Sequence, residues 1–443
     1  MQSAGVPLYS GYFDHKGPVH HWVYQCGYFI AHSLWGIWVV ESLIFLVALS
    51  LLYRGTRRFA GRNLAVLGCL VAMCINRYPF YPESLAFELS LAALGTLLLC
   101  HEKTISWFAM GALAGTCLFI KQTCIGFFVG VGTLCCLQST QSVWRKRIVL
   151  SVLGASLLVA GVSLVLVANG NFKDFLDCCW LFNIRYSTYV SGGLLGRVLT
   201  VLQTHFLLLA IASMSLLLLR NKAALAMLLF LAFELFMLAK AGRFHWYQNI
   251  GVYFAASVPV VYLVSQGLVQ VVSRAMKIFF FCSAFLVCGG AEFVSGFGVS
   301  IVDSIWLSTL CPHQDPVAEI SAYINKLPPA KLVVWGSACD LYLKTGRESP
   351  LAPYYYFNPV ILNERLQDAK LDVSSDEAVI VVDVESTNIE RIETVSPTRS
   401  CALLNSIRTY VKTKCRRIPF SDSAYRVYVP GQLLLGEASG TDK

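Results

Sequence analysis

The sequence predicts an α-helical polytopic membrane protein with a small α/β domain at its C-terminus. Of the 443 residues, 56% are hydrophobic and only 14% are charged, too few to cover the surface of a soluble domain of this size. Apolar runs of bilayer-spanning length recur from Cys26 to about Val294, and ordinary soluble polarity returns from Pro312 onward. We therefore expect a polar exported loop over 1–25, a transmembrane domain over 26–297 and a C-terminal domain over 298–443.

Run length and polar flanks predict about ten transmembrane helices. Two of the runs, 62–76 and 124–138, are short for a span, so they are expected to be tilted, re-entrant or longer than their apolar residues. The expected helices lie near residues 27–52, 62–76, 84–100, 105–120, 124–138, 148–168, 199–219, 223–239, 250–270 and 277–296.

Basic residues predict the orientation of these helices. Four arginines between Arg54 and Arg62 follow the first span, and Arg145, Lys146 and Arg147 follow the fifth. Because cytoplasmic loops are enriched in Lys and Arg, these loops are expected inside. The net charge of +9 is spread over alternate loops rather than gathered in one patch, so we expect no nucleic-acid partner. The segments expected on the exported side are 1–25, 76–83, 169–198, 240–249 and everything after about residue 297.

The C-terminal segment alternates helical and extended patterns. Residues 315–327 have helical periodicity and begin with Asp315 and Pro316, while 331–336, 377–384 and 425–430 are typical of strands. This alternation predicts a small α/β domain.

Most of the sixteen cysteines lie inside apolar spans, where thiols act as packing residues. Cys339, Cys401 and Cys415 fall in the polar C-terminal segment and could form a disulfide there if that segment is exported; their pairing cannot be deduced from sequence. No cysteine pattern has zinc-site spacing. The cofactor is left open: a divalent cation is an alternative that the sequence does not itself indicate.

Several ionisable residues lie in the loops expected on the exported side, where the enrichment of Lys and Arg in cytoplasmic loops does not explain them. Charge at the bilayer boundary on this side favours an anionic partner, and phosphate suits Lys and Arg through charge-assisted hydrogen bonds. The alternative is that they are interfacial side chains that reach from helix ends into water. The candidates are Asp14, His15, Lys16, Glu83, Lys121, Arg243 and His245.

The acidic candidates each have a structural alternative. Asp14 precedes a Gly-Pro bend and is more readily explained as a brace for that turn than as a catalytic base. Glu83 opens a helix, where the dipole stabilises an acid without any function. Glu88 and Glu234 lie inside spans, where an acid is usually paired or faces a cavity, but the sequence assigns them no partner.

Six segments resemble bacterial GT-C glycosyltransferases, the group akin to protein O-mannosyltransferases. The resemblance covers nearly the whole chain, and the matching segments occur in the family's order. They are "VPLYSGYFDHKGPVHHWVYQ" (6–25), "YPESLAFELSLAALGTLLL" (81–99), "GALAGTCLFIKQTCIGFFV" (111–129), "GNFKDFLDCCWLFNIRY" (170–186), "AGRFHWYQNIGVYFAASVP" (241–259) and "VVWGSACDLYLKTGRESPLAPYYY" (333–356).

This resemblance implies transfer of a sugar from a polyprenyl-phosphate donor, such as a dolichyl- or undecaprenyl-phosphate sugar, to a lipid, glycan or protein acceptor. Lys16, Arg243 and His245, with His15 and Lys121, are the implied phosphate partners. In the family the main catalytic acid lies upstream of the residue at which this chain begins. We therefore expect the chain to lack the family's first helix and that acid, with Asp14 and Glu83 as the remaining candidate bases.

Two other functions remain open. One is a polyprenyl-lipid transporter or flippase, which would distribute its cations along a path through the bundle rather than on one face. The other is a GT-C-like protein that binds a lipid-linked sugar without transferring it. In every case we expect an integral protein of the lipid bilayer, most simply the bacterial inner membrane.

Overall fold

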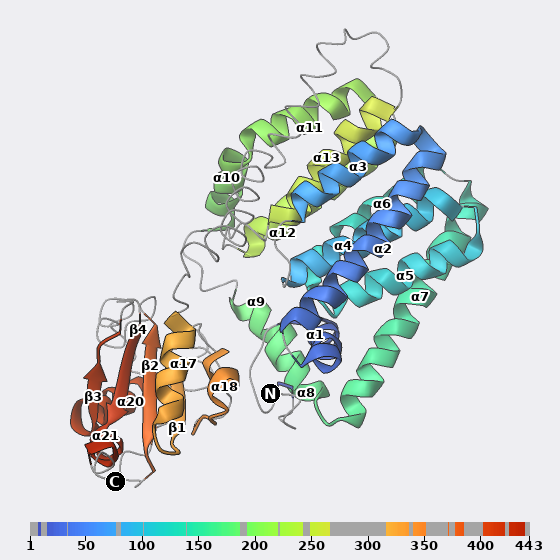
Figure 1. The fold of residues 1–443 in the computed structure, drawn as a ribbon. Coiled ribbons are helices and arrows are strands. Elements are labelled where there is room, and N and C mark those ends of the chain that lie inside the picture. The colour runs from blue at the N-terminus through green and yellow to red at the C-terminus, as the bar shows by residue number, and fades with distance from the viewer. Residues whose placement is uncertain are drawn as a thin grey trace. The chain divides into compact units, whose positions relative to one another are not determined.

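A computed structural model gives two units, divided by their internal contacts: His15–Asp303, and Ser304–Lys443 together with Met1–Asp14. The first unit is helical and the second contains a sheet (Figure 1). The residues that the structure describes are 8–9, 16–32, 34–76, 81–100, 102–138, 140–186, 193–219, 222–241, 249–265, 316–335, 340–350, 371, 377–384, 402–420 and 425–438.

The helical unit is a bundle in which α2 packs along α4, and α5 packs along α7. Its interior is apolar and includes Leu91, Phe127, Phe230 and Phe254. In chain order the helices are α1 (Pro18–Ala31), α2 (Leu34–Ala60), α3 (Arg62–Ile75), α4 (Pro82–Cys100), α5 (Thr104–Leu118), η2 (Gln122–Ile125), α6 (Gly126–Gln138), α7 (Gln141–Ala168), α8 (Phe172–Phe175), η3 (Leu176–Leu181), α9 (Phe182–Tyr186), α10 (Leu194–Thr204), α11 (Phe206–Leu219), α12 (Lys222–Ala241) and α13 (Ile250–Ser265).

Among the described residues, four helical stretches are long and apolar enough to cross a membrane alone: Trp35–Arg58, Pro82–Cys100, Gln141–Ala168 and Lys222–Lys240. The pair α10 and α11 passes the same test as one span bent by 82°. Arg62–Ile75, Thr104–Leu118, Gln122–Leu137 and Ile250–Pro259 are shorter apolar helices. The chain is therefore a membrane protein, while the expected number of about ten spans stays a prediction. The helix expected at 277–296 lies outside the described residues.

The first expected span, 27–52, was wrong in its boundaries. The structure has two helices there, α1 and α2, and α1 already begins at Pro18, inside the segment expected to be a loop. Gly17 is extended and Pro18 occupies the first helical turn, as Pro often does. His32 adopts a left-handed conformation (φ 48°) that ends α1. Only two polar residues, His32 and Ser33, interrupt the apolar sequence at this break, so composition alone did not reveal it.

The expected loop over 169–198 was also wrong, because its first part is helical. α8, the π-helix η3 and α9 follow one another from Phe172 to Tyr186. Phe175, Cys178, Cys179 and Phe182 are buried, so this segment packs its apolar side chains although it is too short and too polar to read as a span.

The sheet unit contains a four-stranded sheet of order β1-β2-β4-β3. β1 (Lys331–Trp335) and β2 (Val379–Val384) are parallel, with Val333 opposite Val381, and β4 (Tyr425–Pro430) is antiparallel to β2. These three strands were predicted from the sequence; the edge strand β3 (Cys415–Ile418) was not. Four helices accompany them: α17 (Pro316–Lys326), α18 (Asp340–Thr345), α20 (Ala402–Lys414) and α21 (Gly431–Ala438).

One side of this sheet packs on α17. Ile320 and Ile324 of α17 join Leu332 and Val334 of β1 and Ile380 of β2 in a buried apolar core. Of the three cysteines considered for a disulfide, Cys415 is a free thiol, and the other two lie outside the described residues.

Candidate functional site

The chain entering α1 is held against the segment that follows α5. The backbone N–H of Gly17 donates to the carbonyl of Ile120 (3.0 Å), and that of Val19 donates to the carbonyl of Phe119 (3.2 Å). A Cβ at position 17 would collide with the Phe119 carbonyl, so only glycine allows this approach. The backbones at Lys16 and Lys121, far apart in the sequence, therefore lie close together.

A third segment fixes the same place. The Cys179 thiol, in η3, donates to the carbonyl of Lys16 (2.8 Å). The carbonyl of Cys179 in turn accepts hydrogen bonds from the side chains of Asn183 (2.6 Å) and Gln122 (3.5 Å). The helical segment after α7 thus supports both the Lys16 backbone and the residue next to Lys121.

Glu83 and Lys121 form an ion pair at this end of the bundle. The Lys121 Nζ lies 2.5 Å from Glu83 Oε1, and the two side chains are only 18% and 5% exposed, respectively. Glu83 lies in the first turn of α4, where the helix dipole also stabilises its charge. The second carboxylate oxygen, Oε2, is buried and receives no hydrogen bond from any described residue. It can therefore accept a hydrogen bond that no described residue supplies.

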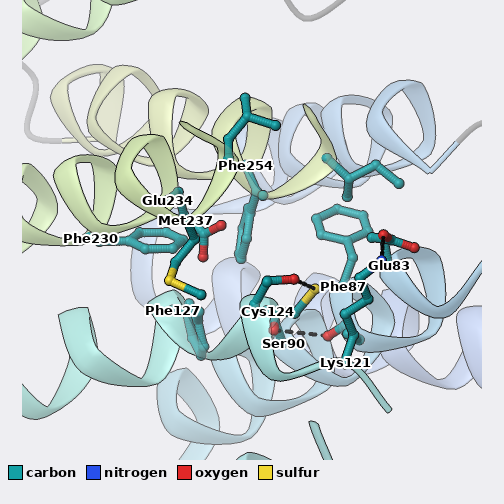
Figure 2. Close-up of a pocket in the computed structure, with 15 residues that line it drawn as sticks. Glu83, Phe87, Ser90, Lys121, Cys124, Phe127, Phe230, Glu234, Met237 and Phe254 are labelled. Carbon is teal, nitrogen blue, oxygen red and sulfur yellow. Dashed lines mark hydrogen bonds and ion pairs between the residues drawn. The ribbon is translucent and has the colours of Figure 1, made fainter. Parts of the chain in front are cut away.

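A small cavity of about 40 Å³ lies beside this pair. Glu83 and Lys121 line one side of it and Glu234 of α12 lines the other, with Phe254 between them (Figure 2). Phe87, Phe127 and Phe230 complete an aromatic boundary.

Glu234 is held where two helices begin. The backbone N–H of Gly126, the first residue of α6, donates to its carboxylate. Gly251, in the first turn of α13, packs so closely on the same carboxylate that a Cβ there, as at Gly126, would collide with it. A carboxylate at a helix N-terminus is stabilised by the exposed N–H groups and the dipole. The sequence signalled Glu234 only as an acid within a span; these partners come from distant segments.

A second polar cluster joins side chains of α1, α2 and α4 with Asn76 at the end of α3. The Asn76 side chain donates to Glu88 Oε1 (2.8 Å), and Glu41 of α2 is 2% exposed. His20 of α1 is buried and packs on the Tyr24 ring, with centroids 4.1 Å apart. The part of the chain that the structure describes contains no group of three His, Cys, Asp or Glu residues able to hold a metal ion.

Of the residues that the sequence singled out, the structure pairs Glu83 with Lys121 and brings the Lys16 backbone beside the Lys121 segment. Asp14, His15, Arg243 and His245 lie outside the described residues. Convergence of Lys16, Arg243 and His245 on one cavity therefore stays a prediction.

No family model and no curated protein matches the sequence. Solved structures do match. Apo ArnT from Cupriavidus metallidurans, a GT-C glycosyltransferase, aligns with a TM-score of 0.53 over 94% of this chain and 88% of its own, at 13% identity. The chain has the GT-C fold.

The same enzyme bound to undecaprenyl phosphate aligns over the same share of each chain, with a TM-score of 0.50. An oligosaccharyltransferase from Archaeoglobus fulgidus, in complex with zinc and sulfate, aligns at a TM-score of 0.42 and 11% identity, covering 95% of this chain and 66% of its own. That third likeness is too distant to carry an argument. The GT-C resemblance of the sequence motifs is thus confirmed at the level of the fold.

Proposed function

We propose that this GT-C protein is a membrane glycosyltransferase that takes a sugar from a polyprenyl-phosphate donor and transfers it to a lipid, glycan or protein acceptor on the exported face. The observation that carries the proposal is the buried Glu83–Lys121 pair, beside which the Lys16 segment is hydrogen-bonded. The likeness to ArnT, solved with undecaprenyl phosphate, supports this donor class.

The residues would divide the chemistry between them. Lys121 and Lys16, with His15, Arg243 and His245 from the motif resemblance, would bind the donor phosphate by charge-assisted hydrogen bonds. The acceptor hydroxyl would attack the anomeric carbon while its proton passes to a carboxylate. The bond between that carbon and the phosphate oxygen breaks, and the polyprenyl phosphate leaves with the bonding electrons, stabilised by the lysines. Glu83 Oε2 is our first choice for the proton acceptor, and Asp14 is the second.

The ion pair complicates a simple test, because removing Lys121 alone leaves a buried carboxylate unpaired. A loss of function in Lys121→Met would then reflect damage to the fold as easily as a lost phosphate contact. The double variant Glu83→Gln/Lys121→Met removes both charges and separates the two explanations.

We would titrate the purified chain and each variant with a polyprenyl-phosphate sugar and measure transfer separately. Loss of one charged phosphate contact costs about 1.5–3 kcal/mol, so Lys121→Met and the double variant should both bind about tenfold to a hundredfold more weakly. Glu83→Gln should keep its affinity while transfer falls by about a hundredfold to ten-thousandfold. Glu102 and Lys103, an exposed acid and base at the other end of α5, provide the controls Glu102→Gln and Lys103→Met.

Normal binding by the double variant would show that Lys121 serves only to neutralise Glu83. Transfer that survives in Glu83→Gln but disappears in Asp14→Asn would make Asp14 the base. Binding without any transfer by the unchanged chain would favour a lipid-linked-sugar binding protein. No binding at all would remove the glycosyltransferase proposal and favour a transporter.

A further inference from the structure

A second, larger cavity lies in the helical unit, away from the Glu83–Lys121 pair. Its volume is about 460 Å³, which falls within the roughly 300–1,000 Å³ of small-molecule sites in proteins. Eight helices of the described part of the chain line it: α2, α3, α4, α5, α6, α7, α12 and α13. Nearly all of the lining residues are aliphatic or aromatic.

This cavity extends toward the end of the bundle that carries the basic loops. Its lining includes Leu52 and Thr56 from the last part of α2, Leu98 from the last part of α4, and Ala223 from the start of α12. Arg147, near the start of α7, also lines it, with its guanidinium 4.9 Å from the centre of the Trp107 ring. At the same end, Arg58 donates to the carbonyl of Leu99 (3.0 Å).

Four phenylalanines separate this cavity from the small one. Phe87, Phe127, Phe230 and Phe254 line both cavities, and their rings contact one another with centroids between 5.1 and 5.9 Å apart. We call these four residues the aromatic partition. Because it lies between the two cavities, the larger one is a separate compartment from the Glu83–Lys121 site.

The lining indicates what the larger cavity would hold. An apolar space of this volume in a membrane protein suits a hydrocarbon chain, and Arg147 is the single charged residue among the described residues that line it. Arginine binds phosphate with charge-assisted hydrogen bonds, and basic pockets between transmembrane helices bind anionic lipid headgroups. We propose that this cavity is a lipid site, with an acyl chain of an anionic phospholipid inside it and the lipid phosphate on Arg147. This inference does not depend on the proposed function.

Two glycines allow a matched test. Gly68 of α3 lines the cavity, and a Cβ placed there meets no atom within 4 Å, so a leucine at this position would enter the cavity without pushing on the backbone. Gly132 of α6 has equally open surroundings but does not line the cavity. Gly68→Leu and Gly132→Leu therefore make the same chemical change inside and outside the proposed site.

The full chain would be reconstituted in nanodiscs of equal parts phosphatidylcholine and phosphatidylglycerol, released, and analysed by native mass spectrometry for retained lipid. We expect the unchanged chain and Gly132→Leu to retain phosphatidylglycerol, and Gly68→Leu to retain about tenfold less. In Arg147→Gln the ratio of retained phosphatidylglycerol to phosphatidylcholine should fall roughly tenfold. Arg145→Gln, at an exposed residue outside the cavity, should keep the ratio of the unchanged chain.

Three results would overturn the proposal: an unchanged chain that retains no lipid, equal retention of both lipids, or equal retention by the two glycine variants. The melting temperature of each variant shows whether it is folded, and the measurement on the unchanged chain stands even if a variant is not.

Discussion

At the scale of single residues, Arg347 ties the end of α17 to the segment after α18. Its guanidinium donates to four carbonyls: those of Ile324 (2.7 Å), Leu327 (2.9 Å), Pro328 (3.0 Å) and Ala330 (3.0 Å). The last carbonyls of a helix have no partner within the helix, and a basic side chain there also interacts favourably with the negative end of the helix dipole. Arg347 thus completes α17 and fixes the turn into β1.

We expect Arg347→Ala to destabilise the sheet unit by about 2–3 kcal/mol, because four carbonyls lose a charged donor at once. The exposed Arg416 of β3 offers a control of equal charge, and Arg416→Ala should change stability by less than about 0.5 kcal/mol. Pulse proteolysis of the full chain in detergent, followed at cleavage sites in the sheet unit, measures both. Equal effects of the two variants would contradict the role assigned to Arg347.

The reactivity of the Cys415 thiol, at the start of β3, depends on its burial. Burial raises the pKa of its thiol from 9.0 to about 12. Only the thiolate reacts rapidly with alkylating reagents. At pH 8 we expect Cys415 to react with iodoacetamide at least about tenfold more slowly in the folded chain than after denaturation, as quantified by peptide mass spectrometry.

The same pKa shift makes folding depend on pH. In the unfolded chain the thiol ionises near its ordinary value of 9.0, whereas in the folded chain it stays protonated to about 12. The free energy of unfolding should therefore fall as the pH rises from about 9 to 12, and the Cys415→Ala variant should show less of this fall. An unchanged slope in the variant would count against the shift.

The sequence identified Glu83 and Lys121 as site candidates because charge at the bilayer boundary is unusual. It could not pair them, since nothing local links α4 to the segment after α5. Glu234 was noted as an acid inside a span, but its partners at Gly126 and Gly251 arise only when α6, α12 and α13 pack together. Residue identity thus indicates that a buried charge needs a partner, while the partner is set by tertiary packing.

At the scale of elements, α5 and α7 cross at very short range. Gly111 of α5 packs on the backbone of Ser151, and Gly154 of α7 packs on the backbone of Phe108. The Ser151 hydroxyl donates to the carbonyl of Trp107 across the same crossing (2.9 Å). Small residues allow helices to approach closely in membranes, where packing rather than water exclusion drives their association.

Gly154→Val should separate these two helices and lower the melting temperature of the full chain in detergent, since overpacking a tight contact costs about 1–3 kcal/mol. Gly161 lies about two turns further along α7 in open surroundings, so Gly161→Val is the control for the valine itself. A similar shift in both variants would indicate a general effect of valine on α7.

Element boundaries were predicted well where polarity changes and poorly where it does not. α3, α4, α5 and α12 begin and end within two residues of the expected ranges. The break between α1 and α2 was missed because only two polar residues, His32 and Ser33, interrupt the apolar sequence there. The helices α8 to α9 were missed because they mix aromatic and charged residues. In both places backbone geometry and tertiary contacts, rather than composition, define the element.

At the scale of the whole molecule, the helical unit has two chemically different ends. One end carries basic residues near the ends of α2, α5 and α7: Arg58, Lys103 and Arg147. At the opposite end, the small cavity is lined by Glu83, Lys121 and Glu234. The alternating basic loops predict that the first of these ends is cytoplasmic.

We expect a cysteine at Lys103 to be protected from a membrane-impermeant maleimide in intact cells and a cysteine at Arg416 to be labelled, with both labelled after the membrane is permeabilised. The reason is that loops rich in Lys and Arg stay inside, which leaves the C-terminal segment outside after the last expected span. Labelling of Lys103→Cys alone in intact cells would reverse the orientation and place the Glu83–Lys121 pair on the cytoplasmic side.

The aromatic partition also has an electrical consequence. Moving one elementary charge across a potential of 100 mV is worth about 2.3 kcal/mol, so a continuous wet path through the bundle would let ions drain the gradient that energises the cell. The contacting rings between the two cavities form an apolar layer in which a bare ion would lose its hydration. A protein with a cavity on each side of this layer can therefore remain an insulator. Opening the layer, as Phe254→Ala would, is expected to make the membrane leak.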